Sequence, residues 1–147
     1  IVPMILRFAE DFNQVNLAIS LHASSDEDRS AIMPINNRYD IKEVLSACDE
    51  YTKKTKRRIT YEYTLVSGVN DSVQSAKRLA GMLKGKLCHV NLIPLNEVKD
   101  SGFVTVSKSK AFEFQKALEE AGIPATIRRE LGDDIDAACG QLRLNNE

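Results

Sequence analysis

Hydrophobic and polar positions along this chain repeat with two different periods, which predict short strands separated by helices. Hydrophobic residues three and four apart predict a helix over 3–12, whereas 16–23 is a short apolar run typical of a buried strand. The elements expected after these are a helix over 24–33, a helix from Asp40, a strand over 58–66, a helix from Asp71 to Gly85, a strand over 87–94, a helix over 109–121 and a strand over 125–130.

The order β-α-β-α-β-α-β, after an opening helix, predicts an α/β fold. Strands and helices that alternate at these lengths favour right-handed crossovers and a parallel sheet. The 147 residues provide room for one domain. Four strands are too few to close an eight-stranded barrel, so the pattern is typical of half of a larger sheet.

Residue types at the helix ends and on the helix faces support these predictions. Asp40 and Glu43 have the spacing of a capping box, and Asp71 is expected to cap the helix that follows it. Cys48 and Cys88 are expected in the core. The buried face of the helix after Asp71 is expected to comprise Val73, Ala76, Leu79, Ala80 and Leu83.

The predicted strands each have one apolar and one more polar face, because side chains alternate along a strand. The apolar faces suit contact with helices, and a polar second face suits the ligand-holding interior of a barrel or partial barrel. The faces with polar groups hold Ala18, Ser20 and His22; Thr60, Glu62 and Thr64; and His89, Asn91 and Ile93. His22, the turn over 67–71 and Asn96 lie at or after strand C-termini, where α/β folds place their sites.

Each of these residues also has a structural interpretation. A lone histidine at a strand end, such as His22, more often makes a structural hydrogen bond than binds a ligand. An acid in the middle of a strand, such as Glu62, also suits pairing with an arginine. Asn70 and Asp71 suit a turn and a helix cap. The basic run over 53–58 suits a solvated helix end as well as a phosphate contact.

Composition and charge narrow the class of protein. The net charge is -1 and the pI is about 6.2, which excludes a surface that is basic throughout, although a local basic patch is compatible with it. Three cysteines, at 48, 88 and 139, form no close pair, so we expect neither a disulfide scaffold nor a metal site, and a reducing, cytoplasmic setting. No apolar run is long enough to span a bilayer.

The chain does not begin with Met, and we expect it to start inside a larger protein.

Cys139 lies in a segment of small and acidic residues, Gly-Asp-Asp-Ile-Asp-Ala-Ala-Cys-Gly-Gln-Leu over 132–142. Three neighbouring acids raise the pKa of a thiol, which is unfavourable for an ordinary thiolate nucleophile. The small residues allow a substrate or a backbone segment to approach closely. From its chemistry alone, the segment fits a packed helical turn as well as a site.

The same segment closely resembles the C-terminal motif of the RlmN family of radical SAM RNA methyltransferases. The resemblance extends over nearly the whole chain and includes Leu-Ala-Ile-Ser-Leu-His-Ala over 17–23, Met-Pro-Ile-Asn over 33–36, Gly-Val-Asn-Asp over 68–71 and Cys-His-Val-Asn-Leu-Ile-Pro-Leu-Asn over 88–96. It implies that the sheet is the C-terminal half of a radical SAM partial barrel of the TIM type. It also implies that residues 1–147 are the C-terminal part of the core domain, truncated on the N-terminal side.

The resemblance implies a reaction and a role for particular residues. Enzymes of this family methylate carbon 2 of an adenine in 23S rRNA and in certain transfer RNAs. Cys139 matches the cysteine that accepts a methyl group from S-adenosylmethionine, and a 5′-deoxyadenosyl radical from a second molecule then activates that methyl group. Ser20, Leu21, His22 and Asn96 match positions that line the S-adenosylmethionine site.

Some motifs of the family are absent from the chain. It contains neither the Cys-x-x-x-Cys-x-x-Cys motif that holds a 4Fe–4S cluster nor the resolving cysteine. We therefore expect the chain alone to be inactive and to bind no cluster. We also expect it to self-associate through an exposed sheet edge or through its apolar interior. Two alternatives remain open. One is a methyltransferase of the related Cfr type, which modifies carbon 8; the other is a stand-alone α/β ligand-binding module without catalysis.

Overall fold

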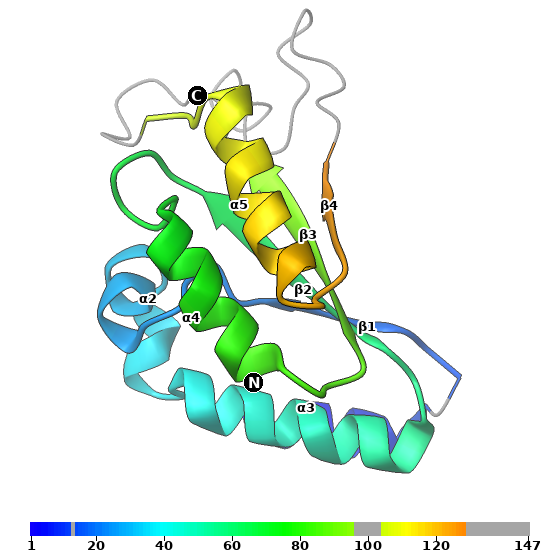
Figure 1. The fold of residues 1–147 in the computed structure, drawn as a ribbon. Coiled ribbons are helices and arrows are strands. Elements are labelled where there is room, and N and C mark those ends of the chain that lie inside the picture. Colours follow the sequence, from blue (N-terminus) through cyan, green and yellow to red (C-terminus); the bar gives the residue numbers. More distant parts are fainter. Residues whose placement is uncertain (13, 96–103, 129–147) are drawn as a thin grey trace, which may run out of the picture.

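A computed structural model describes residues 1–12, 14–95 and 104–128, and in these ranges it shows a parallel four-stranded sheet (Figure 1). The strands are β1 (Leu17–Ser20), β2 (Ile59–Leu65), β3 (Cys88–Pro94) and β4 (Ala125–Ile127). They pair in chain order, and every pairing is parallel. The expected α/β fold with a parallel sheet is thus confirmed.

The helices lie close to the predicted ranges. They are α1 (Val2–Asp11), α2 (Asp26–Ile32), α3 (Ile41–Thr55), α4 (Val73–Leu83) and α5 (Lys108–Glu120), with a short 3-10 helix, η1 (Pro34–Asn37), between α2 and α3. The capping box at α3 is confirmed: the side chain of Asp40 accepts from the backbone N–H of Glu43, whose side chain accepts from the N–H of Asp40. The N-caps of α2, α4 and α5 are serines: the side chains of Ser25, Ser72 and Ser107 each accept from the backbone N–H three residues later.

The start of α4 differs from the sequence prediction in two respects. The N-cap is Ser72, whose side chain accepts from the N–H of Ser75, and not Asp71. Asp71 instead accepts from the N–H of Gly68 inside the preceding turn and pairs with Lys110 of α5 at 3.1 Å. Because the helix begins one residue later than expected, Val73 lies in the first turn and is exposed, so its assignment to the buried face was wrong.

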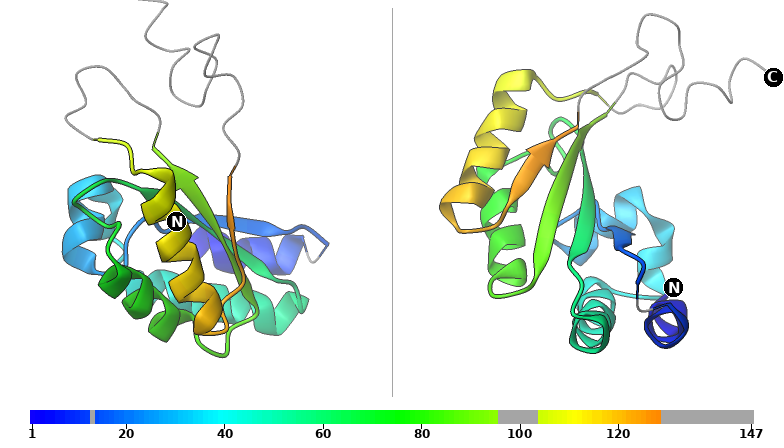
Figure 2. Two further views of the ribbon diagram at one scale, coloured as in Figure 1. Left: turned by 45° about the horizontal axis from the view of Figure 1, so that its top comes forward. Right: turned by 90° about the vertical axis from the view of Figure 1, so that its right-hand side faces the viewer.

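The core lies between one face of the sheet and the helices packed on it (Figure 2). Along β2, the residues on this face are all buried: Ile59, Tyr61, Tyr63 and Leu65. Tyr63 packs against Phe114 of α5 with 5.1 Å between the ring centroids, which joins the sheet to that helix. Cys48 and Cys88 are buried here as expected.

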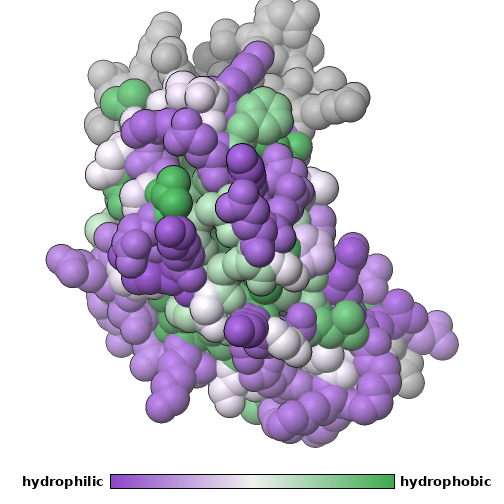
Figure 3. Space-filling model, viewed as in Figure 1, coloured by the Kyte–Doolittle hydropathy of each residue, from purple (hydrophilic) through white to green (hydrophobic). Residues whose placement is uncertain are grey.

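The opposite face of the sheet is more polar and remains partly open to solvent. Ser20 and Thr126 are exposed, and the side chains of Thr60, Glu62, Thr64, His89, Asn91 and Ile93 are half-buried. The two-faced strands predicted from the alternation are therefore present. The helix-covered side is mostly hydrophilic, with a few scattered hydrophobic areas (Figure 3). Val73 of α4 and Phe112 of α5 are among the exposed hydrophobic residues.

Strand β1 is shorter than the apolar run that predicted it. The run extends over 16–23, but the strand ends at Ser20 because His22 adopts a left-handed backbone conformation with φ of 59°. A helix that is long and apolar enough to cross a membrane does not occur in the described part of the chain.

Candidate functional site

The C-terminal end of β1 brings Ser20, Leu21 and His22 to the edge of the open polar face. Ser20 is exposed, His22 is half-buried, and the side chain of Leu21 is fully buried in the core. The backbone N–H groups of Leu21 and His22 both donate to the carbonyl oxygen of Glu62, at 3.0 and 3.2 Å. These bonds hold the chain against β2 immediately after β1 ends. The side chains of Ser20 and His22 therefore lie beside β2.

The imidazole of His22 has a defined tautomer. Its Nδ1 accepts a hydrogen bond from the backbone N–H of Thr64 at 3.0 Å, so the neutral ring carries its proton on Nε2. Burial lowers the pKa of His22, and the positive charge of Arg29 lowers it further. His22 is therefore neutral near pH 7 and has an Nε2–H group for which the structure shows no acceptor among the described residues.

Asn70 connects the end of β1 to the end of β2 from a fully buried position. Its Nδ2 donates to the carbonyl oxygens of His22 and Thr64, at 2.7 Å each, and its Oδ1 accepts from the N–H of Val66 at 2.8 Å. The amide therefore satisfies three backbone groups at the point where two strands end. It also holds His22 in its left-handed conformation, which few residues other than glycine adopt readily.

Arg29 holds the same segment from the other side. Its guanidinium, in a residue only 1% exposed, donates to the carbonyl oxygen of Leu21 at 3.0 Å and to that of Ser20 at 3.5 Å. It also donates to Oδ1 of Asn36 at 2.7 Å and to the carbonyl oxygen of Tyr39 at 3.0 Å. A buried charge is tolerated only where its donors are satisfied, as they are here. Arg29 thereby joins β1 to η1.

The sequence did not indicate either of these supporting roles. Arg29 lies among acidic residues in a short helix, which suggests a solvated position, and Asn70 suits an ordinary turn. The sequence pointed to these positions only through the family resemblance. That resemblance includes Met-Pro-Ile-Asn over 33–36 and Gly-Val-Asn-Asp over 68–71, for which it implied no role. The structure shows that Asn36 and Asn70 of these motifs both support the segment Ser20–Leu21–His22.

The remaining predicted site residues differ in how far the structure describes them. Asn96 and Cys139 lie outside the described residues. Leu21 is described, and its N–H and carbonyl groups are both hydrogen-bonded to the protein. Its buried side chain leaves only its backbone to border a ligand.

The described residues do not supply a metal centre. No group of three or more histidine, cysteine or acidic residues is suitably arranged for a metal within 1–12, 14–95 and 104–128. Burial raises the pKa of Cys48 to about 11 and also raises that of Cys88, so both are protonated thiols within the core. They do not have the character of thiolate ligands to an iron–sulfur cluster.

Comparisons with known proteins find close relatives that are named as methyltransferases. It is 54% identical over 143 residues, 97% of its length, to a Thermoanaerobacter protein named "Probable dual-specificity RNA methyltransferase RlmN". Proteins of the same name from Clostridium perfringens and Staphylococcus aureus are 57% and 52% identical over the same share of the chain. The chain spans 39–42% of the length of these relatives. No protein-family model matches it.

Solved structures give a consistent result. A radical SAM methyltransferase from Sphaerobacter thermophilus matches 96% of the chain with a TM-score of 0.92 and 50% identity, and the chain covers 41% of that protein. A domain of a pyruvate-formate lyase-activating enzyme from Bacteroides vulgatus matches with a TM-score of 0.67 at 17% identity, which shows a shared fold. These findings do not favour the alternative of a stand-alone binding module.

Proposed function

We propose that this chain, which is homologous to RlmN proteins over 97% of its length, is part of a radical SAM RNA methyltransferase. In this proposal Ser20, Leu21, His22 and Asn96 bind S-adenosylmethionine, and Cys139 carries the methyl group. The observation that supports it most strongly is sequence identity of 52–57% to RlmN proteins along almost the entire chain. Residues 1–147 then belong to one radical SAM core domain.

The geometry at the end of β1 fits S-adenosylmethionine. This molecule combines a positive sulfonium with ribose hydroxyl groups and an adenine. The exposed hydroxyl of Ser20 can donate or accept, and the Nε2–H of His22 can donate to a ribose or adenine acceptor. His22 is neutral near pH 7, so it adds no positive charge to repel the sulfonium. When bound, S-adenosylmethionine supplies the methyl group and the radical chemistry of the reaction.

The 4Fe–4S cluster that this chemistry needs does not fit the described residues. Cys48 and Cys88 are buried on the helix-covered side of the sheet. We therefore propose that cysteines outside this chain hold the cluster, and that the chain by itself is inactive. The contribution of this chain is to position S-adenosylmethionine and the methyl-carrying thiol of Cys139.

We further propose that the substrate is an adenine of 23S rRNA and of transfer RNA, and that carbon 2 is methylated in the cytoplasm. The name of the relatives includes dual specificity for RNA. Adjacent acids at 133 and 134, before Ile135, resemble the RlmN sequence more than that of the carbon-8 enzymes.

Mass spectrometry of the product tests the proposed function. A complete methyltransferase containing this chain is reconstituted anaerobically and incubated with S-adenosylmethionine and an rRNA fragment, and the nucleosides are then analysed. We expect 2-methyladenosine, and we expect Cys139→Ala to abolish it. Cys88→Ala, which alters a core thiol, is the control and should retain the product. A product methylated at carbon 8, or none from the unmodified protein, would contradict the proposal.

We also propose that the chain on its own self-associates through β1. This strand pairs only with β2 among the described residues, so its other edge presents backbone groups that can hydrogen-bond to another strand. Light scattering over a range of concentrations tests this. A mass that rises with concentration is expected, whereas a constant monomer mass would exclude the proposal.

A further inference from the structure

A row of polar side chains crosses the open face of the sheet at the level of Ser20. In the register of the sheet, Ser20 lies opposite Glu62, Glu62 opposite Asn91, and Asn91 opposite Thr126. Residues opposite one another in parallel strands project from the same face, at a spacing of about 4.8 Å per strand. The row therefore extends from the predicted S-adenosylmethionine contact Ser20 across the other three strands.

Glu62 is the charged member of this row and is held in a fixed position. The Nδ2 of Asn91 donates to its Oε2 at 2.8 Å, and its backbone carbonyl accepts from both Leu21 and His22. The same residue thus supports the end of β1 through its backbone and presents a carboxylate beside it. Its side chain is half-buried, so a small ligand on the open face can reach it.

No ion pair joins this carboxylate to a positive side chain among the described residues. The ion pairs that the structure shows there do not include Glu62. His89 lies on the same face, but its ring bonds Thr126 at 2.9 Å. Burial lowers the pKa of His89, and the positive charge of Arg58 lowers it further, against a smaller opposite effect of Glu62, so the ring is neutral near pH 7. No arginine forms an ion pair with Glu62 in this part of the chain, and the interpretation that Glu62 faces an arginine stays a prediction.

We propose that Glu62, oriented by Asn91, is a contact of bound S-adenosylmethionine that accepts a hydrogen bond from a donor group of its adenosyl moiety. The inference rests on the proposed function. A half-buried carboxylate is stabilised by a cationic ligand rich in hydrogen-bond donors, and S-adenosylmethionine is such a ligand. Oε1 is the carboxylate oxygen that Asn91 does not engage.

The target adenine of the RNA is the other molecule that this face could admit, and the structure favours the cofactor. Glu62 is paired with Ser20 in the register, on the strand next to it. Its backbone also holds Leu21 and His22. A ligand contacting Ser20 and His22 is therefore within reach of Glu62 without any rearrangement of the sheet.

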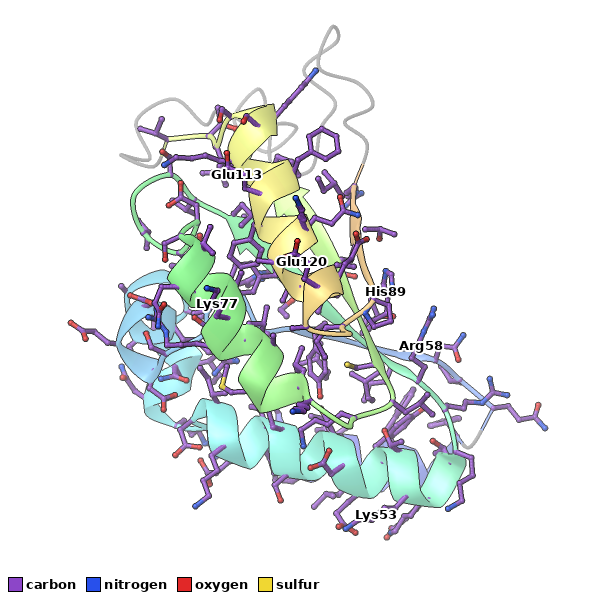
Figure 4. All side chains as sticks on the ribbon, viewed as in Figure 1. Lys53, Arg58, Lys77, His89, Glu113 and Glu120 are labelled. Atoms are coloured by element: carbon purple, nitrogen blue, oxygen red, sulfur yellow. The ribbon has the colours of Figure 1, made fainter. Side chains whose placement is uncertain are left out.

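The test compares two glutamate-to-glutamine variants of the complete, reconstituted protein that contains this chain. Glu62→Gln removes the negative charge at nearly constant shape. Glu113→Gln makes the same change on the exposed surface of α5, away from the open face (Figure 4). Calorimetry measures the dissociation constant of S-adenosylmethionine without RNA, and fluorescence anisotropy measures that of a labelled rRNA hairpin.

We expect Glu62→Gln to weaken S-adenosylmethionine binding by about tenfold to a hundredfold, as for the loss of one charge-assisted hydrogen bond. RNA affinity should be unchanged, and Glu113→Gln should bind both ligands normally. Glu62→Asp, which keeps the charge but shortens the side chain, should fall between Glu62→Gln and the unmodified protein. This second variant separates loss of the contact from loss of folding, which circular dichroism checks in each case.

The opposite outcomes overturn the inference. Unchanged S-adenosylmethionine binding by a folded Glu62→Gln variant excludes the contact. A variant that loses affinity for RNA alone would assign Glu62 to the target base instead. If the unmodified protein fails to bind S-adenosylmethionine, the proposed function itself fails and this inference fails with it.

Discussion

At the scale of single residues, the candidate site depends on side chains that a ligand need not touch. His22 has a left-handed backbone, and its conformation is fixed by Glu62 through its N–H, by Asn70 through its carbonyl oxygen and by Thr64 through its ring. The first two bonds fix the backbone of His22 and the third orients its ring, so the Nε2–H group is held in a defined place. A side chain held in this way loses little entropy when a ligand binds.

Replacing Arg29 tests its part in this support. Arg29→Met removes four hydrogen bonds to acceptors around a residue that is 1% exposed, and it leaves buried oxygen atoms unsatisfied. We expect a loss of about 3 kcal/mol or more in the free energy of unfolding. Urea unfolding of the chain measures it. Arg7→Met breaks only an exposed pair with Asp11 and should cost less than about 0.5 kcal/mol. Equal losses in both variants would contradict the assignment.

The stability of the chain should depend on pH through His22. Burial lowers the pKa of His22 in the folded chain below its unfolded value of about 6.5. Between these two values the unfolded chain binds more protons, so the free energy of unfolding rises with pH through that window. The contribution of His22 is complete above about pH 6.5 and is lost as the pH falls toward its folded pKa.

Urea unfolding at pH 7.5 and 5.5 measures this dependence. His22→Asn retains a residue that tolerates a left-handed backbone but does not titrate, so its stability should change less between the two pH values. The same experiment with the surface variant Arg7→Met should retain the full dependence. An identical pH dependence in His22→Asn and the unmodified chain would show that His22 does not titrate as described.

At the scale of elements, the turn over 67–71 connects the C-terminal ends of β1 and β2. Asn70 lies in that turn, and its side chain reaches back to the ends of both β1 and β2. The segment between the strand and α4 is therefore part of the site rather than a simple connection. Asp71 contributes in the same way by bonding the N–H of Gly68, which has a positive φ of 74°.

Asn70→Asp tests the donor role of this amide. The change replaces an NH2 group that donates to two carbonyl oxygens with an oxygen that repels them, in a fully buried position. We expect a loss of about 3 kcal/mol in the free energy of unfolding near pH 7. Burial beside carbonyl oxygens raises the pKa of such a carboxyl group, so part of the loss should be recovered as the pH falls toward about 4 and the group becomes a protonated donor. Asn37→Asp, at an exposed position of η1, should change stability by less than about 0.5 kcal/mol. Equal effects at the two positions would contradict this role.

The sequence allowed the elements of the fold to be predicted better than the contacts of the site. Alternation in β2 and the capping box at Asp40 depend on local physics, and both were confirmed. The cap of α4 was placed one residue early because Asp71 and Ser72 are both good N-caps, and Asp71 is instead engaged by the N–H of Gly68 and by Lys110. Arg29 and Asn70 were missed because their partners lie on other elements, up to 48 residues away in the case of Asn70 and His22.

At the scale of the whole molecule, the sheet separates two environments with different chemistry. Thiols and aromatic rings lie on the helix-covered face, whereas Ser20, Glu62 and Asn91 occupy the open face. This separation fits a layered α/β fold in which one face makes the core and the other binds a ligand. Because Cys48 and Cys88 lie on the helix-covered face, their thiols are not accessible to a ligand on the open face.

An iron–sulfur reconstitution of the chain alone is the clearest test of that separation. A 4Fe–4S cluster needs several thiolates that converge on one point. Cys48 and Cys88 are buried, and their raised pKa values keep them protonated, so ligation by either would require both unfolding of the core and loss of a proton. We expect anaerobic incubation with iron and sulfide, followed by desalting, to leave far fewer than the four iron atoms per chain that such a cluster contains.

Cys48→Ala and Cys88→Ala should give the same low iron content as the unmodified chain. A stoichiometric cluster that disappears in either variant would show that the core opens to bind it, and would contradict the assignment of the cluster to residues outside this chain.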